Sequence, residues 1–208
     1  VTRLRVALDG NDVVFTDWAD RSSVVISHIL PEGVRLVLRV HSLDALDPWF
    51  HLMRWPAVDQ VIVTSEPLRS LVCDLLLTAG ARTPVVVLPN LVNMLSFDRP
   101  KRPDARHTLG LVGWGRRVKD PLWALNLLAR EPSWRLRLIG PDFVEQSSAT
   151  TADYVETVRS RLTDPSIKDR VDVVGRTDDV AAELAHVGVI LSSSRRENFH
   201  LGLVEGVA

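Results

Sequence analysis

Apolar residues along the chain alternate between short continuous runs and longer stretches in which they recur every third or fourth position. The runs predict buried strands, and the stretches predict amphipathic helices. In the first half, strands are expected at 12–16, 34–40, 60–64 and 84–88, and helices at 20–29, 44–54 and 66–79. In the second half, strands are expected at 107–113, 134–139, 170–175 and 187–191, and helices at 120–129, 151–162, 178–186 and after residue 198. This alternation predicts an α/β protein whose parallel strands are joined by helical crossovers.

One segment, 89–106, interrupts the alternation with Pro89, Pro100 and Pro103 and a basic, polar run. Such a composition is typical of a connection between domains. We therefore expect a first lobe at 1–95, a linker at 96–106 and a second lobe at 107–208.

Composition and charge narrow the class of protein. The 208 residues are 46% hydrophobic and 25% charged, which is ordinary for a globular domain. The formal net charge of -1 provides no general attraction to nucleic acid, so anions must be recognised locally. The single cysteine, Cys73, excludes a disulfide framework and a cysteine-rich metal site, and we interpret it as a small core residue.

Membrane and targeting signals are sparse in the sequence. No apolar run approaches the ~20 residues that a membrane-spanning helix needs, and no signal peptide opens the chain. We therefore expect a cytoplasmic protein, and peripheral contact with the inner face of the membrane stays open as an alternative.

Candidate binding chemistry is concentrated at the end of the chain. Glu197 follows the last predicted strand, and loops at the carboxyl ends of strands are where open α/β sheets bind ligands. The next helix would begin with the N–H groups of Phe199, His200 and Leu201 unpaired, which suits a phosphate. Glu205 lies two helical turns further on, where its two oxygens suit a pair of vicinal hydroxyls.

The spacing of Glu197 and Glu205, with Phe199 between them, resembles the E-x7-E motif of a known family. This is the large group 1 family (family 4) of retaining glycosyltransferases, which use nucleotide sugars. Other segments follow in the family's order, namely Gly113 after a strand, Lys119-Asp120-Pro121, Leu138-Ile139-Gly140 and 169–175. The family usually has glycine at the position of His200. A solvated pair of helical glutamates is the alternative interpretation of the spacing itself.

The resemblance implies a GT-B fold, which consists of two Rossmann-like lobes with parallel sheets. It also implies a chain that is incomplete at both ends. The family's second lobe continues beyond the second glutamate, and its first lobe begins with a glycine-rich turn that is absent before Asp12. The implied activity moves a glycosyl group from a nucleoside-diphosphate sugar, with UDP or GDP as the nucleotide, to a glycan, lipid or small-molecule acceptor. The anomeric configuration would be retained.

The resemblance also places cationic residues beside the donor diphosphate. Lys119 falls on the family's lysine, which follows the strand that ends near Gly113. The family's arginine falls on Trp114, so Arg116 or Arg117 would have to supply that charge. A solvated lysine ahead of a helix is the alternative for Lys119. Because a lysine is unfavourable at a helix N-terminus, a bound anion would explain its position.

The remaining implied contacts involve the sugar and the ribose. The resemblance implies that Glu197 binds sugar hydroxyls and that Glu205 binds the nucleoside ribose. It also implies that His41 faces the reacting sugar from the first lobe. A structural hydrogen-bonding role is the alternative for His41. Trp18 and Trp49 follow strands of the first half, where each would either stack on an acceptor sugar or serve packing.

We expect no cofactor and no metal, since the chain lacks an Asp-x-Asp metal motif and its basic groups would neutralise the diphosphate. Two other classes of function stay open. One is a sugar-nucleotide epimerase or hydrolase on the same fold. The other is a non-catalytic module that binds nucleotide sugars, which Trp114 and His200 keep in consideration.

Overall fold

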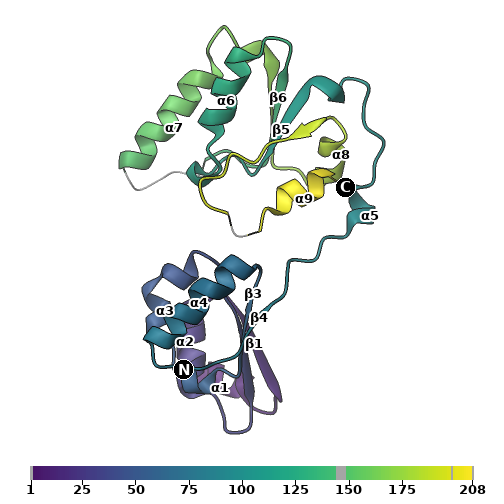
Figure 1. Cartoon of the computed structure of the whole chain (residues 1–208). Coiled ribbons are helices and arrows are strands. Elements are labelled where there is room, and N and C mark those ends of the chain that lie inside the picture. The colour runs from purple at the N-terminus through teal and green to yellow at the C-terminus, as the bar shows by residue number, and fades with distance from the viewer. Residues whose placement is uncertain (1, 144–148, 198, 208) are drawn as a thin grey trace. The chain divides into compact units, whose positions relative to one another are not determined.

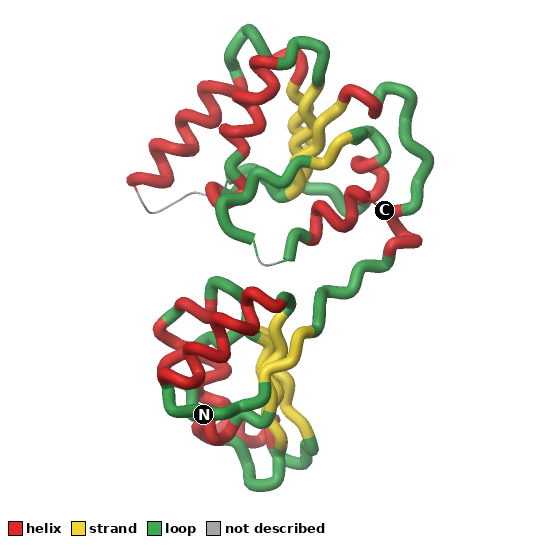
Figure 2. Tube along the Cα trace, in the orientation of Figure 1, coloured by secondary structure: helices red, strands yellow, loops and turns green. Residues whose placement is uncertain are grey.

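The chain forms two compact units, Val1–Asn90 and Leu91–Ala208, in a computed structural model that describes residues 2–143, 149–197 and 199–207. Each unit contains a four-stranded parallel sheet accompanied by helices (Figures 1 and 2). The predicted α/β class, with parallel strands joined by crossovers, is therefore confirmed.

In the first unit, the strands lie in the order in which they occur along the chain. They are β1 (Val13–Asp17), β2 (Arg35–Arg39), β3 (Gln60–Val63) and β4 (Val85–Val87). The helices are α1 (Thr2–Leu8), α2 (Arg21–Ile29), α3 (Pro48–Leu52) and α4 (Glu66–Thr78). Helices α2, α3 and α4 lie on one side of this sheet in Figure 1. Alternate strand residues such as Leu36 and Leu38 are fully buried, whereas Phe15 and Val86 are exposed.

In the second unit, the strand order reverses within the sheet. The strands are β5 (Thr108–Val112), β6 (Arg135–Ile139), β7 (Val171–Gly175) and β8 (Val189–Ile190), in the order β7-β6-β5-β8. The helices are α5 (Met94–Phe97), α6 (Pro121–Arg130), α7 (Ala149–Leu162), α8 (Val180–Leu184) and α9 (Leu201–Val207). Strand β5 pairs with β6 on one side and β8 on the other, so the chain switches direction at β5. Ligands of open α/β sheets bind at such a switch point, beyond the carboxyl ends of the strands.

The helix predicted at 44–54 is broken in the structure. A 3-10 turn, Asp44–Leu46, comes first, and α3 begins only at Pro48. Pro48 has no N–H to continue the earlier turn, and its fixed φ suits a helix start. Asp47 caps the new helix by accepting a hydrogen bond from the Trp49 N–H at 3.3 Å.

The segment expected as a linker makes specific contacts with the second unit. The Lys101 ammonium donates to the Leu184 carbonyl at 3.1 Å, and the Arg102 N–H donates to the Ala185 carbonyl at 2.8 Å. Both carbonyls lie at the end of α8, where a helix leaves carbonyl groups without intrahelical partners. The chain around 101–102, within the segment expected as a linker at 96–106, is therefore attached to α8.

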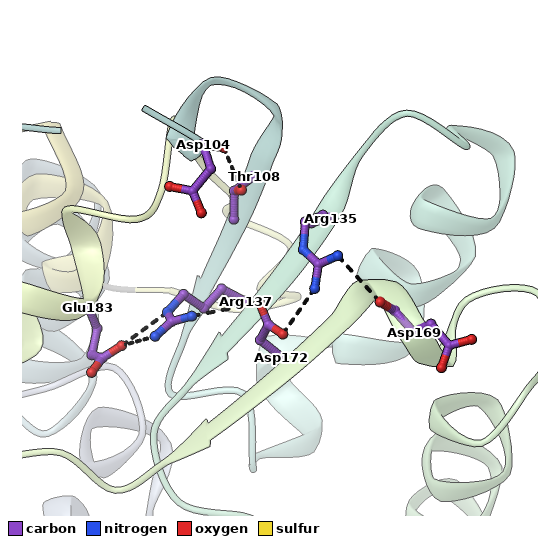
Figure 3. Close-up of polar contacts among 7 residues, drawn as sticks. All are labelled: Asp104, Thr108, Arg135, Arg137, Asp169, Asp172 and Glu183. Carbon is purple, nitrogen blue, oxygen red and sulfur yellow. Dashed lines mark hydrogen bonds and ion pairs between the residues drawn. The ribbon is translucent and has the colours of Figure 1, made fainter. Parts of the chain in front are cut away.

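A cluster of charged residues lies on the α8 side of the second sheet (Figure 3). Arg137 of β6 donates to Glu183 of α8 from Nε at 3.0 Å and also from a terminal nitrogen. Asp172 of β7 lies 3.7 Å from Arg137 and 3.2 Å from Arg135. Each of these charges has a partner in the described chain, so we interpret the cluster as the attachment of α8 to the sheet.

The described helices are short compared with a membrane span. The longest, α7, has 14 residues, whereas a span needs ~20. Within the described residues, no helix is both long enough and apolar enough to cross a bilayer.

Candidate functional site

Two glycines bring together the loops that follow β5 and β6. Gly113 follows β5 with φ 72°, and its N–H donates to the Ile139 carbonyl at 2.7 Å. Gly140 follows β6 with φ 117°, and a Cβ at that position would lie 3.2 Å from the Gly113 Cα. Glycine tolerates both the positive φ and the close approach. The carboxyl edge of the sheet is therefore lined by closely packed backbone.

Trp114 lies in the loop after β5 and contacts the loop after β6. Its side chain is buried, with 1% exposed. The indole N–H donates to the Gly140 carbonyl at 3.0 Å, and the ring meets Phe143 edge-on at a centroid distance of 5.6 Å. Trp114, the residue that the resemblance places at the arginine position, thus belongs to the core.

Lys119 is a buried cation with a carboxylate partner. It ends the 3-10 turn Arg117–Lys119, and its surface is only 7% exposed. Its ammonium lies 2.5 Å from Glu197 Oε2. Lysine is almost never this buried without a partner, and the contact with Glu197 provides that partner.

The side chains of the adjacent residues Arg116 and Arg117 point in different directions, one toward Gly113 and the other toward Tyr154. A Cβ placed on Gly113 would lie 3.6 Å from the Arg116 Nη2 and 3.9 Å from the Lys119 Cε, so both side chains reach the same glycine. The Arg117 guanidinium instead lies over the Tyr154 ring of α7, at 5.4 Å from its centroid. This is cation–π geometry. Arg116 is thus the arginine that accompanies Lys119 at Gly113.

The loop after β8 is attached to the loop after β5 by several hydrogen bonds. The Arg195 N–H donates to the Val118 carbonyl at 2.9 Å, and the Ser193 hydroxyl donates to the Lys119 carbonyl at 2.7 Å. The Arg195 side chain also donates to Asp120 Oδ2 at 2.8 Å. Residues at 193–197 and at 118–120 therefore form one surface, although they are far apart in the sequence.

Within the described residues, the contacts of Glu197 are made through Oε2. Oε2 accepts from Lys119 at 2.5 Å and from the Ser194 hydroxyl at 3.1 Å, and His200 Nε2 lies 3.8 Å away. Burial raises the pKa of Glu197, but the hydrogen bond and charge of Lys119 outweigh it, so the pKa is below its ordinary 4.5. The carboxylate is therefore ionised at neutral pH.

His200 uses its ring to cap α9. Its Nδ1 accepts a hydrogen bond from the Leu203 N–H at 3.3 Å, so the ring proton belongs on Nε2, which lies 3.4 Å from the Ser194 hydroxyl. Burial and then the nearby Lys119 charge lower the pKa of His200 below its ordinary 6.5. A neutral imidazole is therefore expected at His200 at neutral pH.

The backbone at the start of α9 differs from the predicted row of free donors. Of the three N–H groups predicted to be unpaired, that of Leu201 donates to the Phe199 carbonyl at 2.9 Å. The Val204 N–H donates to the His200 carbonyl at 3.1 Å, as in a regular helix. The cationic side chains are therefore the clearest anion-binding groups of this site.

Helix α9 lies directly on the strands through two glycines. A Cβ on Gly202 would lie 2.9 Å from the Val112 Cβ, and one on Gly206 would lie 2.8 Å from the Ile190 Cγ1. Glu205 is half-buried, and burial raises the pKa of its carboxyl above 4.5. Among the described residues it forms no hydrogen bond or ion pair, so its two oxygens are free to accept from a ligand.

In the first unit, one buried carboxylate joins the loops after β1 and β2. Asp44 accepts from the His41 N–H at 2.6 Å and from the Ala19 N–H at 2.7 Å. Burial raises the pKa of Asp44 by more than these two hydrogen bonds lower it, so the pKa lies above its ordinary value. The His41 ring stacks on Trp18 at 4.2 Å, and its Nε2 lies 2.9 Å from Asp17 Oδ1. His41 is thereby fixed on three sides.

Trp18 adopts a backbone conformation that is rare for a large residue. Its φ is 103°, whereas bulky residues seldom leave the negative range. Two hydrogen bonds hold it, from its N–H to the Arg39 carbonyl at 2.9 Å and from the Ser23 hydroxyl to its carbonyl at 2.6 Å. Its side chain is 45% exposed. Strain of this kind is concentrated at functional sites. Trp49 lies elsewhere, in α3.

The structure thus gathers the predicted residues into two groups. Gly113, Arg116, Lys119, Glu197 and His200 meet at the switch point of the second sheet, with Glu205 on the adjoining α9, whereas Arg117 points toward α7. His41 belongs to the first unit and has its own surroundings. Sequence reasoning did not single out Asp17, the last residue of β1, or Asp44, which begins the 3-10 turn after β2. No cluster of three metal-ligating side chains occurs within the described ranges.

Comparison with known proteins adds information about the fold. No protein-family model matches the sequence, and no curated protein sequence matches it. Among solved structures, Anabaena Alr3699/HepE in complex with UDP matches 99% of this chain and 60% of its own, with a TM-score of 0.78 and 17% identity. The chain has the GT-B fold. The predicted fold class, with two Rossmann-like halves, is therefore confirmed.

Other GT-B structures resemble the chain to a similar extent. A glycosyltransferase from Rickettsia africae matches with a TM-score of 0.72 and 13% identity, over 99% of this chain and 58% of its own. The pneumococcal O-GlcNAc transferase GtfA, in complex with UDP and GlcNAc, matches with a TM-score of 0.69 and 14% identity, over 99% of this chain and 42% of its own. The chain therefore spans three fifths or less of the length of these GT-B proteins.

Proposed function

We propose that this GT-B protein transfers a glycosyl group from a nucleoside-diphosphate sugar to an acceptor. The observation that carries the proposal is the convergence of Lys119 and Arg116 on Gly113, at the switch point of a Rossmann-like sheet. A close-packed glycine edge with two cations suits a diphosphate. The solved structures of HepE with UDP and with UDP-glucose support UDP as the first nucleotide to test.

The proposed chemistry depends on electrostatic stabilisation of the leaving group. When the bond between the sugar and the diphosphate breaks, negative charge builds on phosphate oxygen and positive character builds on the sugar ring. Lys119, which is buried, and Arg116, which is exposed, would stabilise the departing diphosphate beside Gly113. We propose that the reaction retains the anomeric configuration, as the E-x7-E spacing of Glu197 and Glu205 implies.

The two glutamates would divide the recognition of the donor. Glu197 lies next to Lys119, so its carboxylate suits hydroxyls of the transferred sugar. Glu205 has unpaired acceptor oxygens on α9 and suits the vicinal hydroxyls of the ribose. In the first unit, we propose that His41 contacts the sugar and that Asp17 holds the orientation of its ring. A glycan, a lipid and a small molecule all stay open as acceptors.

A non-catalytic module that binds nucleotide sugars is a second candidate, and the burial of Trp114 favours it. Because Trp114 stands at the family's arginine position, the loop after β5 has one fewer cation for the leaving group. Such a module would hold the ligand at Lys119 and Glu205 without cleaving it.

The deciding experiment measures binding first and turnover second. Calorimetric titration of the intact protein with UDP, GDP and their sugar conjugates should identify a nucleotide sugar that binds. Release of nucleoside diphosphate is then followed with and without candidate acceptors. Acceptor-dependent release indicates a transferase, release to water alone indicates a hydrolase, and binding without release indicates the non-catalytic module. Absence of binding to every nucleotide and nucleotide sugar would contradict the proposal.

A further inference from the structure

Donor groups that would suit a phosphate already surround a carboxylate of the chain itself. Three side chains point at one oxygen, Glu197 Oε2: the Lys119 ammonium at 2.5 Å, the Ser194 hydroxyl at 3.1 Å and the His200 Nε2 at 3.8 Å. The carboxylate of Glu197 thus fills the position of an anion among these groups.

A bound phosphate would share the Lys119 ammonium with Glu197. The surface of Lys119 is 7% exposed, and its ammonium already contacts Glu197. A phosphate oxygen close to Gly113 would lie near both Arg116 and the Lys119 side chain, and the latter also contacts Glu197. The loop is also held in place by the Ser193 hydroxyl, which bonds the Lys119 carbonyl. A bound diphosphate would therefore compete with the carboxylate for this ammonium, while the lysine backbone stays held by Ser193.

We propose that Glu197 is an internal competitor for the phosphate and that this exchange makes the site select a sugar nucleotide over the bare nucleoside diphosphate. The inference rests on the proposed function. A displaced Glu197 loses its main donor while it stays partly buried, which is unfavourable. The sugar of a sugar nucleotide supplies new hydroxyl donors to it, whereas a bare diphosphate supplies none.

The same exchange favours release of the product. Once the sugar has left for the acceptor, Glu197 has no hydroxyl partners and lies next to an anionic diphosphate. It then competes again for the Lys119 ammonium, and the like charges repel each other. The carboxylate that holds the donor sugar would thus weaken the binding of the spent nucleotide.

The test compares three ligands on the intact protein and on Glu197→Gln, a variant that keeps the shape of the side chain but removes its charge. Inorganic pyrophosphate reports on the anion position alone, and UDP and UDP-glucose report on product and donor. We expect pyrophosphate and UDP to bind roughly 10-fold more tightly to the variant, because charge pairs of this kind contribute at least that much when partly buried. The preference for UDP-glucose over UDP should fall by a similar factor, and product inhibition by UDP should strengthen.

Two control variants separate this effect from a general change of charge or a general loss of binding. Glu156→Gln removes one negative charge from an exposed position on α7 and should leave all three affinities unchanged. Glu205→Gln should weaken UDP and UDP-glucose equally, so that their ratio and the affinity for pyrophosphate stay constant. If Glu197→Gln does not fold, Glu197→Asp draws the carboxylate away from Lys119 and should give an intermediate gain in pyrophosphate affinity.

The outcomes distinguish this inference from the proposed function. Unchanged or weaker binding of pyrophosphate and UDP to the Glu197 variants overturns the exchange, even if nucleotide sugars bind and react. Tighter binding of pyrophosphate to the variants, with no binding of any nucleotide, supports the exchange at Lys119 and contradicts the proposed function.

Discussion

At the scale of single residues, Arg116 and Arg117 differ in the groups that their side chains contact, and we assign only Arg116 to the proposed diphosphate site. The two are adjacent in the sequence, and the composition of the loop does not separate them. In the structure, Arg116 lies beside Gly113 with Lys119, whereas Arg117 lies over the Tyr154 ring. The difference follows from the 3-10 turn Arg117–Lys119, which turns successive side chains in different directions.

We predict that Arg116→Ala and Lys119→Ala each lower turnover of the donor by ~100-fold or more, the effect of removing one donor from a transition-state charge site. Arg117→Ala should change turnover only slightly, because its guanidinium is directed at Tyr154. Steady-state rates with a reacting donor and acceptor provide the measurement. Equal losses in the two arginine variants would show that the assignment to Arg116 is wrong.

His200 gives the free energy of unfolding a dependence on pH. Burial and Lys119 lower its pKa in the folded protein, whereas Glu197 raises it by less, and the unfolded chain has the ordinary 6.5. Between the folded value and 6.5 the unfolded state binds more protons, so stability decreases as the pH falls through this window. Above 6.5 the full contribution is present.

We therefore expect the unfolding free energy of the wild type to fall more steeply than that of His200→Gln when the pH is lowered from about 7.5 to about 5. Glutamine retains a hydrogen-bond acceptor for the Leu203 N–H but does not titrate. Urea unfolding at a series of pH values measures both slopes. Parallel slopes would mean that His200 does not control this dependence.

The positions of single residues along the chain were more predictable than their contacts. The alternation of strands and helices places Glu197 and Lys119 in loops at the same edge of one sheet. Their ion pair joins positions 78 residues apart, and no local pattern specifies which oxygen meets which ammonium. Asp44 was also beyond prediction, because its two N–H partners belong to different loops that meet only in the folded unit.

At the scale of elements, α9 illustrates how glycine spacing positions a functional residue. Gly202 and Gly206 are four residues apart, so they lie on the same face of the helix, and that face touches Val112 and Ile190. The close contact fixes the distance between α9 and the sheet, and with it the position of Glu205.

We predict that Gly206→Ala destabilises the second unit by ~1–3 kcal/mol, a typical cost of overpacking, and weakens binding of the nucleotide. The added methyl would meet three atoms of the β-branched Ile190 at 2.8, 2.9 and 3.0 Å, so the helix must shift. Denaturant unfolding and calorimetric titration measure the two effects. Val207→Ala, at a position that is 70% exposed on the same helix, is the matched control and should have little effect.

The elements themselves were predictable where a strand is a continuous apolar run, as is usual in parallel sheets buried between helices. The prediction failed where a local feature overrides the pattern. Pro48 breaks the helix predicted at 44–54, and α1 and α5 lie where no periodic apolar pattern was recognised. Both of these helices are short, and short helices depend on their tertiary contacts.

At the scale of the whole molecule, the two units have separate cores. The buried cluster of the first unit, which includes Leu38, shares no residue with the clusters of the second unit, which include Leu138. The sequence predicted two lobes from the interruption at 89–106, and the structure divides the chain after Asn90. Composition alone did not reveal that 101–102 is held by α8.

We predict that Leu38→Ala and Leu138→Ala, both at fully buried strand positions, each cost ~2–5 kcal/mol in their own unit. Hydrogen exchange followed by mass spectrometry should show faster exchange in residues 1–90 for Leu38→Ala and in residues 91–208 for Leu138→Ala. Binding of UDP should survive the first substitution better than the second. If either variant accelerates exchange equally in both halves, the cores are not independent.

The burial of Trp114 has an optical consequence. Its indole ring is held by the Gly140 carbonyl and Phe143, directly next to the glycine that Arg116 and Lys119 approach. Of the six tryptophans in the chain, this one is buried next to the charges of the site. When an anion arrives and Glu197 moves, the electric field at the ring changes, and so should the wavelength of its emission. Ligand binding should therefore be measurable from the intrinsic fluorescence of the unlabelled protein.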